Sequence, residues 1–276
     1  MNVLSPSEQY LQDFHQRVAG ATSAAFATSP AKTKSRVYKS SYEVLTSAAL
    51  GSPRPNAVLD VACGDGHLLG LLAATSVPLT LVGLDMSLGE LQIARAALPN
   101  HVLLLKERAQ KMSLASGSID VVVSHMALML MDEIESVLAE IHRVLARDGT
   151  FAAMVGRTFL LGAVNAIFLD IFRPIAEEDL LPMPFGDRRT RSTEGWAELL
   201  DTDFYDLQFE DVDVLWQPTP SELWNALTET YDIDRLSDGA RLRLKKALVA
   251  ELSRIQDSEG RLQTGWGLRF IQARAR

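Results

Sequence analysis

The chain has one cysteine among its 276 residues, Cys63, so it cannot form an intrachain disulfide. This favours a reducing compartment, and we expect a cytoplasmic protein. Residues 1–20 lack a basic segment followed by an apolar one, so no secretory signal peptide is expected. The most apolar run, residues 159–169, contains Asn165 and is too short to span a bilayer, so we expect no membrane association.

Basic residues are also scarce, with 27 Lys and Arg against 35 Asp and Glu and a net charge of −8. A general nucleic-acid-binding protein carries a basic surface, so we expect no nucleic-acid partner. No internal repeat or low-complexity segment is found. With 47% hydrophobic residues, a chain of this length can bury a large core, and the sequence predicts a globular fold.

Short, continuously apolar segments are abundant instead, and helical segments lie between several of them. The apolar segments span residues 57–62, 79–85, 102–107, 118–126 and 149–156. Such runs are typical of parallel strands whose two faces are both covered by helices. Residues 134–145 carry apolar side chains at helical spacing, which predicts a helix between the last two strands. The alternation predicts an α/β protein with a doubly wound, mostly parallel sheet that binds ligands outside the carboxyl ends of its strands.

Segments before and after this core predict added helices and further strands. Residues Ser5-Pro6-Ser7-Glu8 form a capping box with proline at the first helical position, so a helix is expected to begin there. A second helix is expected at 36–50. Residues 157–191 contain an apolar helix and a loop rich in proline and arginine, and another capping box begins at Thr219. Two further strands, which bring the sheet to seven, are expected at residues 208–216 and 265–274.

The most informative motif runs from Val58 to His67, where an apolar strand passes through Asp60 into a turn with two glycines. Gly64 and Gly66 give the backbone freedom to reverse, and without a Cβ they let a ligand approach the main chain. The helix that follows presents unpaired N–H groups to that ligand. The motif therefore predicts a site for a nucleotide-type cofactor.

Two details separate the classes of cofactor. The dinucleotide-binding fingerprint requires a third glycine at the position of Leu69, but Gly70 comes one residue later. In addition, Asp60 precedes the glycines, where its carboxylate would face a pyrophosphate. A cofactor with an ammonium and a sulfonium group fits that carboxylate far better.

These features resemble the class I S-adenosylmethionine (SAM) dependent methyltransferases, particularly the branch with the ubiquinone and small-molecule methyltransferases. The resemblance covers about residues 35–156 and rests on Asp60-to-Gly66, on Val82-Gly83-Leu84-Asp85-Met86 and on Ala109-to-Asp120. It implies a Rossmann-like SAM-binding fold, SAM as cofactor and a small-molecule methyl acceptor in biosynthetic metabolism. The expected division is a helical lid (1–50), a SAM-binding core (51–156), a cap insertion (157–191) and a C-terminal part (192–276) with a helical insertion at about 217–262.

The resemblance assigns cofactor contacts around the glycine turn. Asp85, at the end of the second strand, is expected to accept the two ribose hydroxyls, each charge-assisted bond contributing about 1.5–3 kcal/mol. The alternative role of Asp85 is a cap for the following helix. Met86 is expected to lie along the adenine or to pack in the core. Gly64 and Gly66 admit the methionine part of the cofactor, and Ala62 stands where the family commonly has a further glycine.

Further contacts are expected after the third strand. Family members often carry an aspartate and an alanine that hold the adenine edge, and here Arg108 takes the place of the aspartate. A guanidinium has no acceptor, so it cannot accept the adenine amino proton. We expect the Ala109 N–H to meet a ring nitrogen. Gln110 either supplies the missing acceptor or is a solvent-exposed helix residue.

The remaining expected contacts come from the fourth strand and from the helix before the first. Ser124 and His125 lie where family members hold the amino-acid part of the cofactor. His125 could instead contact the substrate or be a packed, hydrogen-bonded core histidine. Tyr38 and Tyr42 are expected to close the cofactor pocket with a hydroxyl, or to be core residues.

No catalytic base is identifiable by spacing, because methyl transfer depends mainly on alignment and a base is optional. The catalytic candidates are His125, Arg157 and Tyr38. Arg157 follows the fifth strand, and there it would meet a carboxylate on the acceptor or be solvated. Cys63 is expected to be a small turn residue, not a nucleophile. We expect no metal centre.

Several alternatives remain open. Methionine and aromatic residues after the fourth strand and in the added segments suggest an apolar acceptor pocket, although core packing explains them too; they are Met126, Met129, Met131, Trp196, Trp224 and Tyr231. An enzyme that attacks the aminocarboxypropyl side of SAM and releases methylthioadenosine would carry nearly the same motifs. So would an inactive SAM-binding sensor or partner subunit. The sequence assigns no acceptor atom and no oligomeric state.

Overall fold

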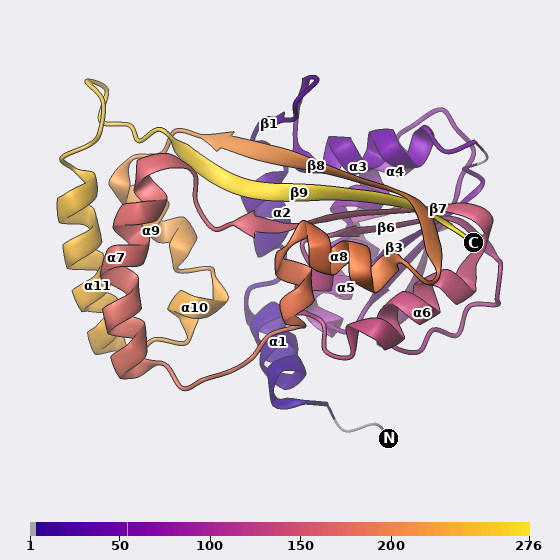
Figure 1. Cartoon of the computed structure of the whole chain (residues 1–276), viewed down its shortest axis with the longest axis horizontal. Helices are drawn as coiled ribbons and strands as arrows, with labels where there is room; N and C mark the ends of the chain where they lie inside the picture. Colours follow the sequence, from indigo (N-terminus) through magenta and orange to yellow (C-terminus); the bar gives the residue numbers. More distant parts are fainter. Residues whose placement is uncertain (1–3, 54) are drawn as a thin grey trace.

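The computed structural model describes residues 4–53 and 55–276. Residues 1–3, which belong to the predicted N-terminal lid and to the segment considered for a signal peptide, lie outside the described residues. Figure 1 shows a twisted sheet with helices on both faces and a separate group of helices at one end. None of the helices in the described part of the chain is long and apolar enough to cross a membrane.

One half of the sheet is parallel and matches the five predicted core strands. Its strands are β3 (Ala57–Val61), β4 (Thr80–Asp85), β5 (Leu103–Lys106), β6 (Ile119–His125) and β7 (Leu145–Thr158). They lie in the order β7-β6-β3-β4-β5, and every neighbouring pair is parallel. The chain order reverses between β3 and β6, where the switch point of a doubly wound sheet places a ligand.

The other half of the sheet is antiparallel and longer than predicted. β9 (Thr264–Ala275) pairs with β7, and β8 (Phe204–Trp216) pairs with β9. Two short strands, β1 (Ala31–Lys32) and β2 (Val37–Tyr38), then extend the edge beyond β8, so the described residues form nine strands. The predicted count of seven was therefore wrong. Two-residue strands are too short to show an alternation of apolar and polar residues, so no periodic pattern predicts them.

Helices cover both faces of the sheet. α3 (Ser41–Leu50), α4 (His67–Ala73) and α5 (Leu88–Ala97) contribute to one buried cluster, and α6 (Ile134–Val144) and α8 (Thr193–Leu200) to the other. α6 buries the apolar positions that predicted it, including Ile134 and Ile141. α3 begins later than the predicted helix at 36–50, because its N-cap is Ser40, whose side chain accepts from the Glu43 N–H.

The helical group at the left of Figure 1 is formed by the two segments inserted after β7 and after β8. It consists of α7 (Gly162–Asp179), α9 (Pro220–Leu227), α10 (Tyr231–Asp234) and α11 (Asp238–Leu252). Ser237 joins them by donating its N–H and its hydroxyl to the Asp179 carboxylate, both at 2.7 Å. Two N-terminal helices, α1 (Pro6–Arg17) and α2 (Ala21–Phe26), lie between this group and the sheet (Figure 1). The capping box predicted at Ser5 is formed.

Candidate active site

Near its carboxyl end, β3 contains a buried carboxylate, Asp60, with an unpartnered oxygen. Asp60 is 2% exposed, and its Oδ1 has no hydrogen-bond partner among the described residues. Burial raises the pKa of Asp60 well above its usual value, and the nearby Asp85 and Asp65 raise it further. An unpaired buried carboxylate is costly. A cationic ligand beside Asp60 would remove this cost.

Asp85 holds the glycine turn to the end of β4. Its Oδ2 accepts the Gly64 N–H at 2.9 Å, and its Oδ1 accepts the Ser87 N–H at 2.8 Å. Ser87 itself caps α5, so the alternative role of Asp85 as the cap was wrong. Each carboxylate oxygen keeps a further lone pair. Asp85 can therefore still accept a hydroxyl from a ligand.

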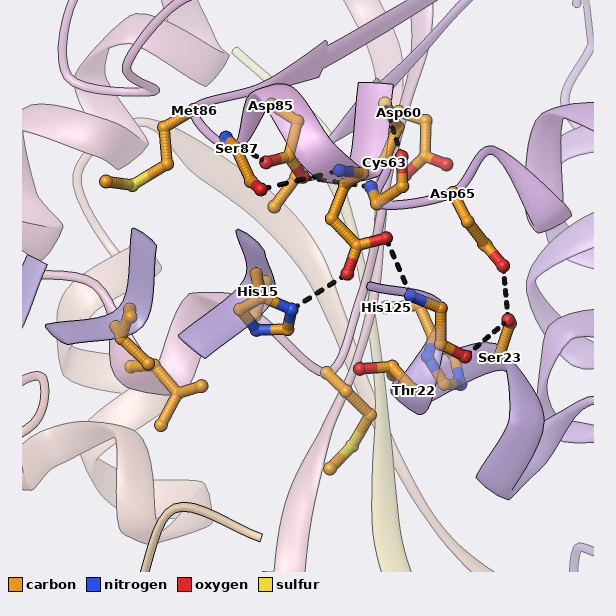
Figure 2. Close-up of a pocket in the computed structure, with 18 of the residues that line it drawn as sticks. His15, Thr22, Ser23, Asp60, Cys63, Asp65, Asp85, Met86, Ser87 and His125 are labelled. Carbon is orange, nitrogen blue, oxygen red and sulfur yellow. Dashed lines mark hydrogen bonds and ion pairs between the residues drawn. The ribbon is translucent and has the colours of Figure 1, made fainter. Parts of the chain in front are cut away.

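These residues line a cavity of about 130 Å³, which we call the acidic cavity (Figure 2). Its lining includes the carboxylates of Asp60, Asp65, Asp85 and Glu90, and no lysine or arginine is among the described residues around it. Such a site fits a cation and disfavours a diphosphate. Gly64, with φ of 54°, and Ala62 also line it, so a ligand can approach the turn closely. The ammonium, sulfonium and ribose hydroxyls of SAM match this set of groups.

Seven of the expected cofactor residues line the acidic cavity: Asp60, Ala62, Gly64, Asp85, Met86, His125 and Tyr42. Gly66 does not, and its place is fixed by packing. It has a φ of 79°, and a Cβ there would lie 2.7 Å from Leu98 Cδ1. Ser124 is buried, and its hydroxyl donates to the Val61 carbonyl at 2.8 Å. These two residues shape the turn and its neighbouring strand.

Near the expected adenine edge, the side chains of Arg108 and Gln110 are hydrogen-bonded to α1. Arg108 pairs with the Glu8 carboxylate, and the Gln110 amide donates to Glu8 Oε1 at 3.1 Å and to the Asp132 carbonyl at 2.9 Å. Ala109 is buried in the core. The structure therefore places Ala109 and Gln110 outside the described lining of the acidic cavity. The alternative of Gln110 as a solvent-exposed residue was wrong, because it is half-buried against α1.

Tyr38 and Tyr42 lie in different places. Tyr38 belongs to β2 and not to the helix, and the guanidinium of Arg36 stacks on its ring at 3.9 Å. It lines neither cavity described here. Tyr42 lies on α3, lines the acidic cavity and is 5% exposed. Burial and the Asp65 carboxylate raise its pKa, so its hydroxyl stays protonated.

His125, at the end of β6, is a neutral histidine within the acidic cavity. Its Nε2 lies 2.8 Å from Ser41 Oγ, whereas its buried Nδ1 has no partner among the described residues. Burial lowers the pKa of His125 to about 3, and the proximity of His67 contributes. The ring therefore offers one free nitrogen and no charge.

α1 closes the acidic cavity from outside the sheet. Gln12 on this helix donates to the Met86 carbonyl at 3.1 Å, and Gln16 accepts the Gly89 N–H at 2.9 Å. Ligand pockets typically have volumes of about 300–1,000 Å³. The acidic cavity, of about 130 Å³, is smaller than this, and α1 forms part of its wall.

Three residues of the acidic cavity form a polar cluster that was not predicted from the sequence. His15 Nδ1 lies 2.8 Å from Glu90 Oε1, and His15 Nε2 lies 2.9 Å from the Tyr231 hydroxyl. In Figure 2, a dashed line from the labelled His15 marks its interaction with Glu90. Glu90 stands in the first turn of α5, where acidic residues are common because of the helix dipole, so its position gave no distinctive signal.

A second cavity, of about 720 Å³, adjoins the first, and we call it the aromatic cavity. Its aromatic lining residues are Phe14, Phe26, Phe159, Phe185, Trp216, Tyr231 and Trp266. Of the residues considered for an acceptor pocket, Met126, Met129 and Tyr231 line it, whereas Trp196 and Trp224 are buried in the two core clusters. The aromatic and acidic cavities share Thr22, Met126, Leu130 and Tyr231.

Arg157 also lines the aromatic cavity, but its charge is already paired. Its Nη2 donates to Asp213 Oδ1 at 2.6 Å, and its Nε lies 3.5 Å from Asp211 Oδ2. Cys63 is buried, and burial raises the pKa of its thiol, so it is a poor nucleophile. Within residues 4–53 and 55–276, no group of three or more His, Cys, Asp or Glu side chains is placed to hold a metal ion.

Comparison with known proteins agrees with this geometry. A methyltransferase domain family matches residues 59–153. A malonyl-[acyl-carrier protein] O-methyltransferase of Methylovorus sp. (strain MP688) is 28% identical over 167 residues, which cover 57% of this chain and 56% of that protein. The ubiquinone/menaquinone biosynthesis C-methyltransferase UbiE of Campylobacter jejuni is 29% identical over 102 residues, which cover 35% and 43% of the two chains. The chain thus spans about half the length of these curated relatives.

The fold is shared more widely. The structure of a putative type II methyltransferase from Anaeromyxobacter dehalogenans superimposes with a TM-score of 0.61 at 18% identity, covering 84% of this chain and 95% of that one. This likeness shows the fold. The matched family adds the cofactor, and the acidic cavity has the groups to hold it. Residues 59–153 thus match a methyltransferase domain, and the chain is similar to SAM-dependent methyltransferases.

Proposed function

We propose that the chain is a methyltransferase that transfers the methyl group of SAM to an apolar, aromatic small molecule in a biosynthetic pathway. The observation that carries this proposal is the contact between the two cavities. Because Thr22, Met126, Leu130 and Tyr231 line both, a methyl donor in the acidic cavity and an acceptor in the aromatic cavity would be neighbours. Methyl transfer requires this proximity and alignment above all.

The proposed cofactor contacts follow from the acidic cavity. Asp85 would accept the ribose hydroxyls, Asp60 and the free His125 nitrogen would hold the amino-acid part, and Met86 would lie beside the adenine. When bound, SAM supplies an electrophilic methyl group on a positively charged sulfur. The carboxylates around the cavity offset that charge in the ground state.

The acceptor class is inferred from the aromatic cavity. Its volume of about 720 Å³ suits a molecule well above the size of an amino acid, and its lining is largely apolar. The names of the two relatives describe an O-methyltransferase and a C-methyltransferase, so they do not decide the acceptor atom. A carboxylate on the acceptor remains a prediction carried by Arg157, and it would have to compete with Asp213.

Product analysis tests the proposal. The full chain is incubated with methyl-labelled SAM and a panel of bicyclic phenols, amines and carboxylic acids, and the products are identified by mass spectrometry. Labelled acceptor together with S-adenosylhomocysteine supports methyl transfer. Methylthioadenosine would instead support attack on the aminocarboxypropyl side. Tight SAM binding without any product over the panel would favour the sensor or partner-subunit alternative.

A further inference from the structure

A hydrogen-bonded chain of three side chains connects the two cavities. The Tyr231 hydroxyl lies 2.9 Å from His15 Nε2, and His15 Nδ1 lies 2.8 Å from Glu90 Oε1. The three residues come from α10, α1 and α5, and all of them line the acidic cavity. Of the three, only Tyr231 also faces the aromatic cavity. Tyr231, at one end of these three hydrogen-bonded side chains, therefore lies where an acceptor would meet the methyl donor.

The hydrogen-bond partners determine which atom donates the proton in each of these two hydrogen bonds. Glu90 is buried, and its Oε2 already accepts the Gly20 N–H at 3.0 Å, so its carboxylate acts as an acceptor. His15 Nδ1 then donates to Glu90, which leaves Nε2 without a proton and able to accept the Tyr231 O–H. Burial and the nearby Glu90 raise the pKa of Tyr231 above its usual value, so the phenol keeps the proton that it donates.

We propose that Tyr231, His15 and Glu90 form a proton relay that removes the proton of the methyl acceptor. This inference rests on the proposed methyl transfer. It assigns the acceptor a weakly acidic group, such as a phenol or enol hydroxyl, because a carboxylate would have no proton to give. Tyr231 is the catalytic residue, since it faces the acceptor. His15 receives a proton from Tyr231, and Glu90 orients His15.

The proposed step transfers a methyl group and a proton. The electron pair of the acceptor oxygen forms the new bond to the methyl carbon, and the pair of the carbon–sulfur bond returns to sulfur. The acceptor proton passes to the Tyr231 oxygen while the Tyr231 proton passes to His15 Nε2. The products are a methyl ether and an imidazolium beside the Glu90 carboxylate, which stabilises it.

The relay depends on closure of α1, because His15 belongs to that helix. Tyr10 and Arg17 of α1 both bond the Asp234 carboxylate on α10, at 2.8 and 2.9 Å, and so dock the two helices. In the docked state, His15 reaches both Tyr231 and Glu90. Closing the cavity and completing the relay are thus the same movement.

The first experiment measures which ring nitrogens of His15 carry a proton, and it needs no methyl acceptor. The full chain with ¹⁵N-labelled histidine is bound to S-adenosylhomocysteine and studied by NMR near neutral pH, and His15→Gln identifies the His15 signals. We expect a neutral ring with the proton on Nδ1, and a changed Nε2 shift in Tyr231→Phe. A proton on Nε2, or a ring that stays doubly protonated, would overturn the relay.

The second experiment measures turnover of the full chain with a naphthol and with the corresponding naphthoic acid. Tyr231→Phe should lower kcat for the naphthol at least about 100-fold with little change in KM. Methylation of the acid should be unaffected. His15→Gln should lower kcat for the naphthol as well, whereas Tyr205→Phe, a tyrosine bonded to Asp148 outside both cavities, should behave as wild type.

The outcomes separate the two proposals. Equal losses with both probes in Tyr231→Phe, or an unchanged naphthol rate, would reject the relay while leaving methyl transfer intact. A chain that binds S-adenosylhomocysteine but methylates neither probe would count against the proposed methyl transfer to such acceptors. In that case the NMR measurement still decides the direction of the Tyr231–His15–Glu90 hydrogen bonds.

Discussion

Arg108, which follows β5, pairs with Glu8 of α1, and this pair ties the helix to the segment after β5. The Glu8 side chain is 7% exposed and the Arg108 side chain 20% exposed. Removing one partner of such a pair leaves a buried charge behind, a loss that costs about 3–5 kcal/mol when burial is complete. In a terminal helix, local opening relieves that cost. The pair is therefore expected to control how long the cavity stays closed.

Arg108→Gln should open α1 without unfolding the core. We expect S-adenosylhomocysteine to dissociate at least about 10-fold faster, measured by stopped-flow displacement, and the α1 amides to exchange faster with deuterium. Arg254→Gln is the matched control, because Arg254 pairs with Glu251 on an exposed helix end. A dissociation rate equal to that of wild type would show that Arg108 does not hold the lid.

Asp60→Asn should stabilise the ligand-free chain and weaken its binding of SAM. Removing the unpaired buried carboxylate is expected to raise the free energy of unfolding by about 1–3 kcal/mol in urea titrations. The loss of a charge-assisted bond to the cofactor ammonium, about 1.5–3 kcal/mol, should weaken binding about 10- to 100-fold by calorimetry. Asp170→Asn, at an exposed position on α7, should change neither quantity.

The pH dependence follows from the raised pKa of Asp60. Because the folded pKa lies above the unfolded one, wild type loses stability relative to Asp60→Asn as pH rises from the ordinary carboxyl range through the raised value. Only the ionised form attracts the ammonium group, so SAM affinity should increase over the same interval. A SAM affinity with the same pH profile in both proteins would refute the assignment of Asp60 to the cofactor.

The parts of the site that could be predicted from the sequence are those close together in the chain. Asp60 and Asp85 lie at the carboxyl ends of two neighbouring parallel strands, and Gly64 follows the first of them, so the three residues meet at one edge. His15 and Tyr231 are far from them in sequence and reach the site through the docking of α1 on α10. No periodicity encodes such a tertiary contact. The edge strands β1 and β2 were not predicted for a related reason, since β1 forms by pairing with β8 and β2 by pairing with β1.

Ala62→Gly should stabilise the chain, because Ala62 has a φ of 58° and this left-handed conformation disfavours a Cβ. The expected gain is up to about 1 kcal/mol in urea unfolding. Ala57→Gly, in the strand that precedes Ala62, is the control, and there glycine should cost about 0.5–1 kcal/mol. Destabilisation by Ala62→Gly would mean that the Ala62 methyl group makes packing contacts that outweigh the strain.

Arg157 provides a test of a carboxylate on the acceptor. If the guanidinium meets such a group, Arg157→Gln should raise KM for a hydroxynaphthoate about 10-fold while leaving KM for the matching naphthol unchanged. Asp213→Asn should do the opposite, since it removes the carboxylate that now accepts from Arg157 at 2.6 Å and frees the guanidinium for the acceptor. Steady-state kinetics with both probes measures the two KM values. Parallel changes of KM for both acceptors would assign Arg157 to linking β7 with β8 across β9, because Asp211 and Asp213 both belong to β8.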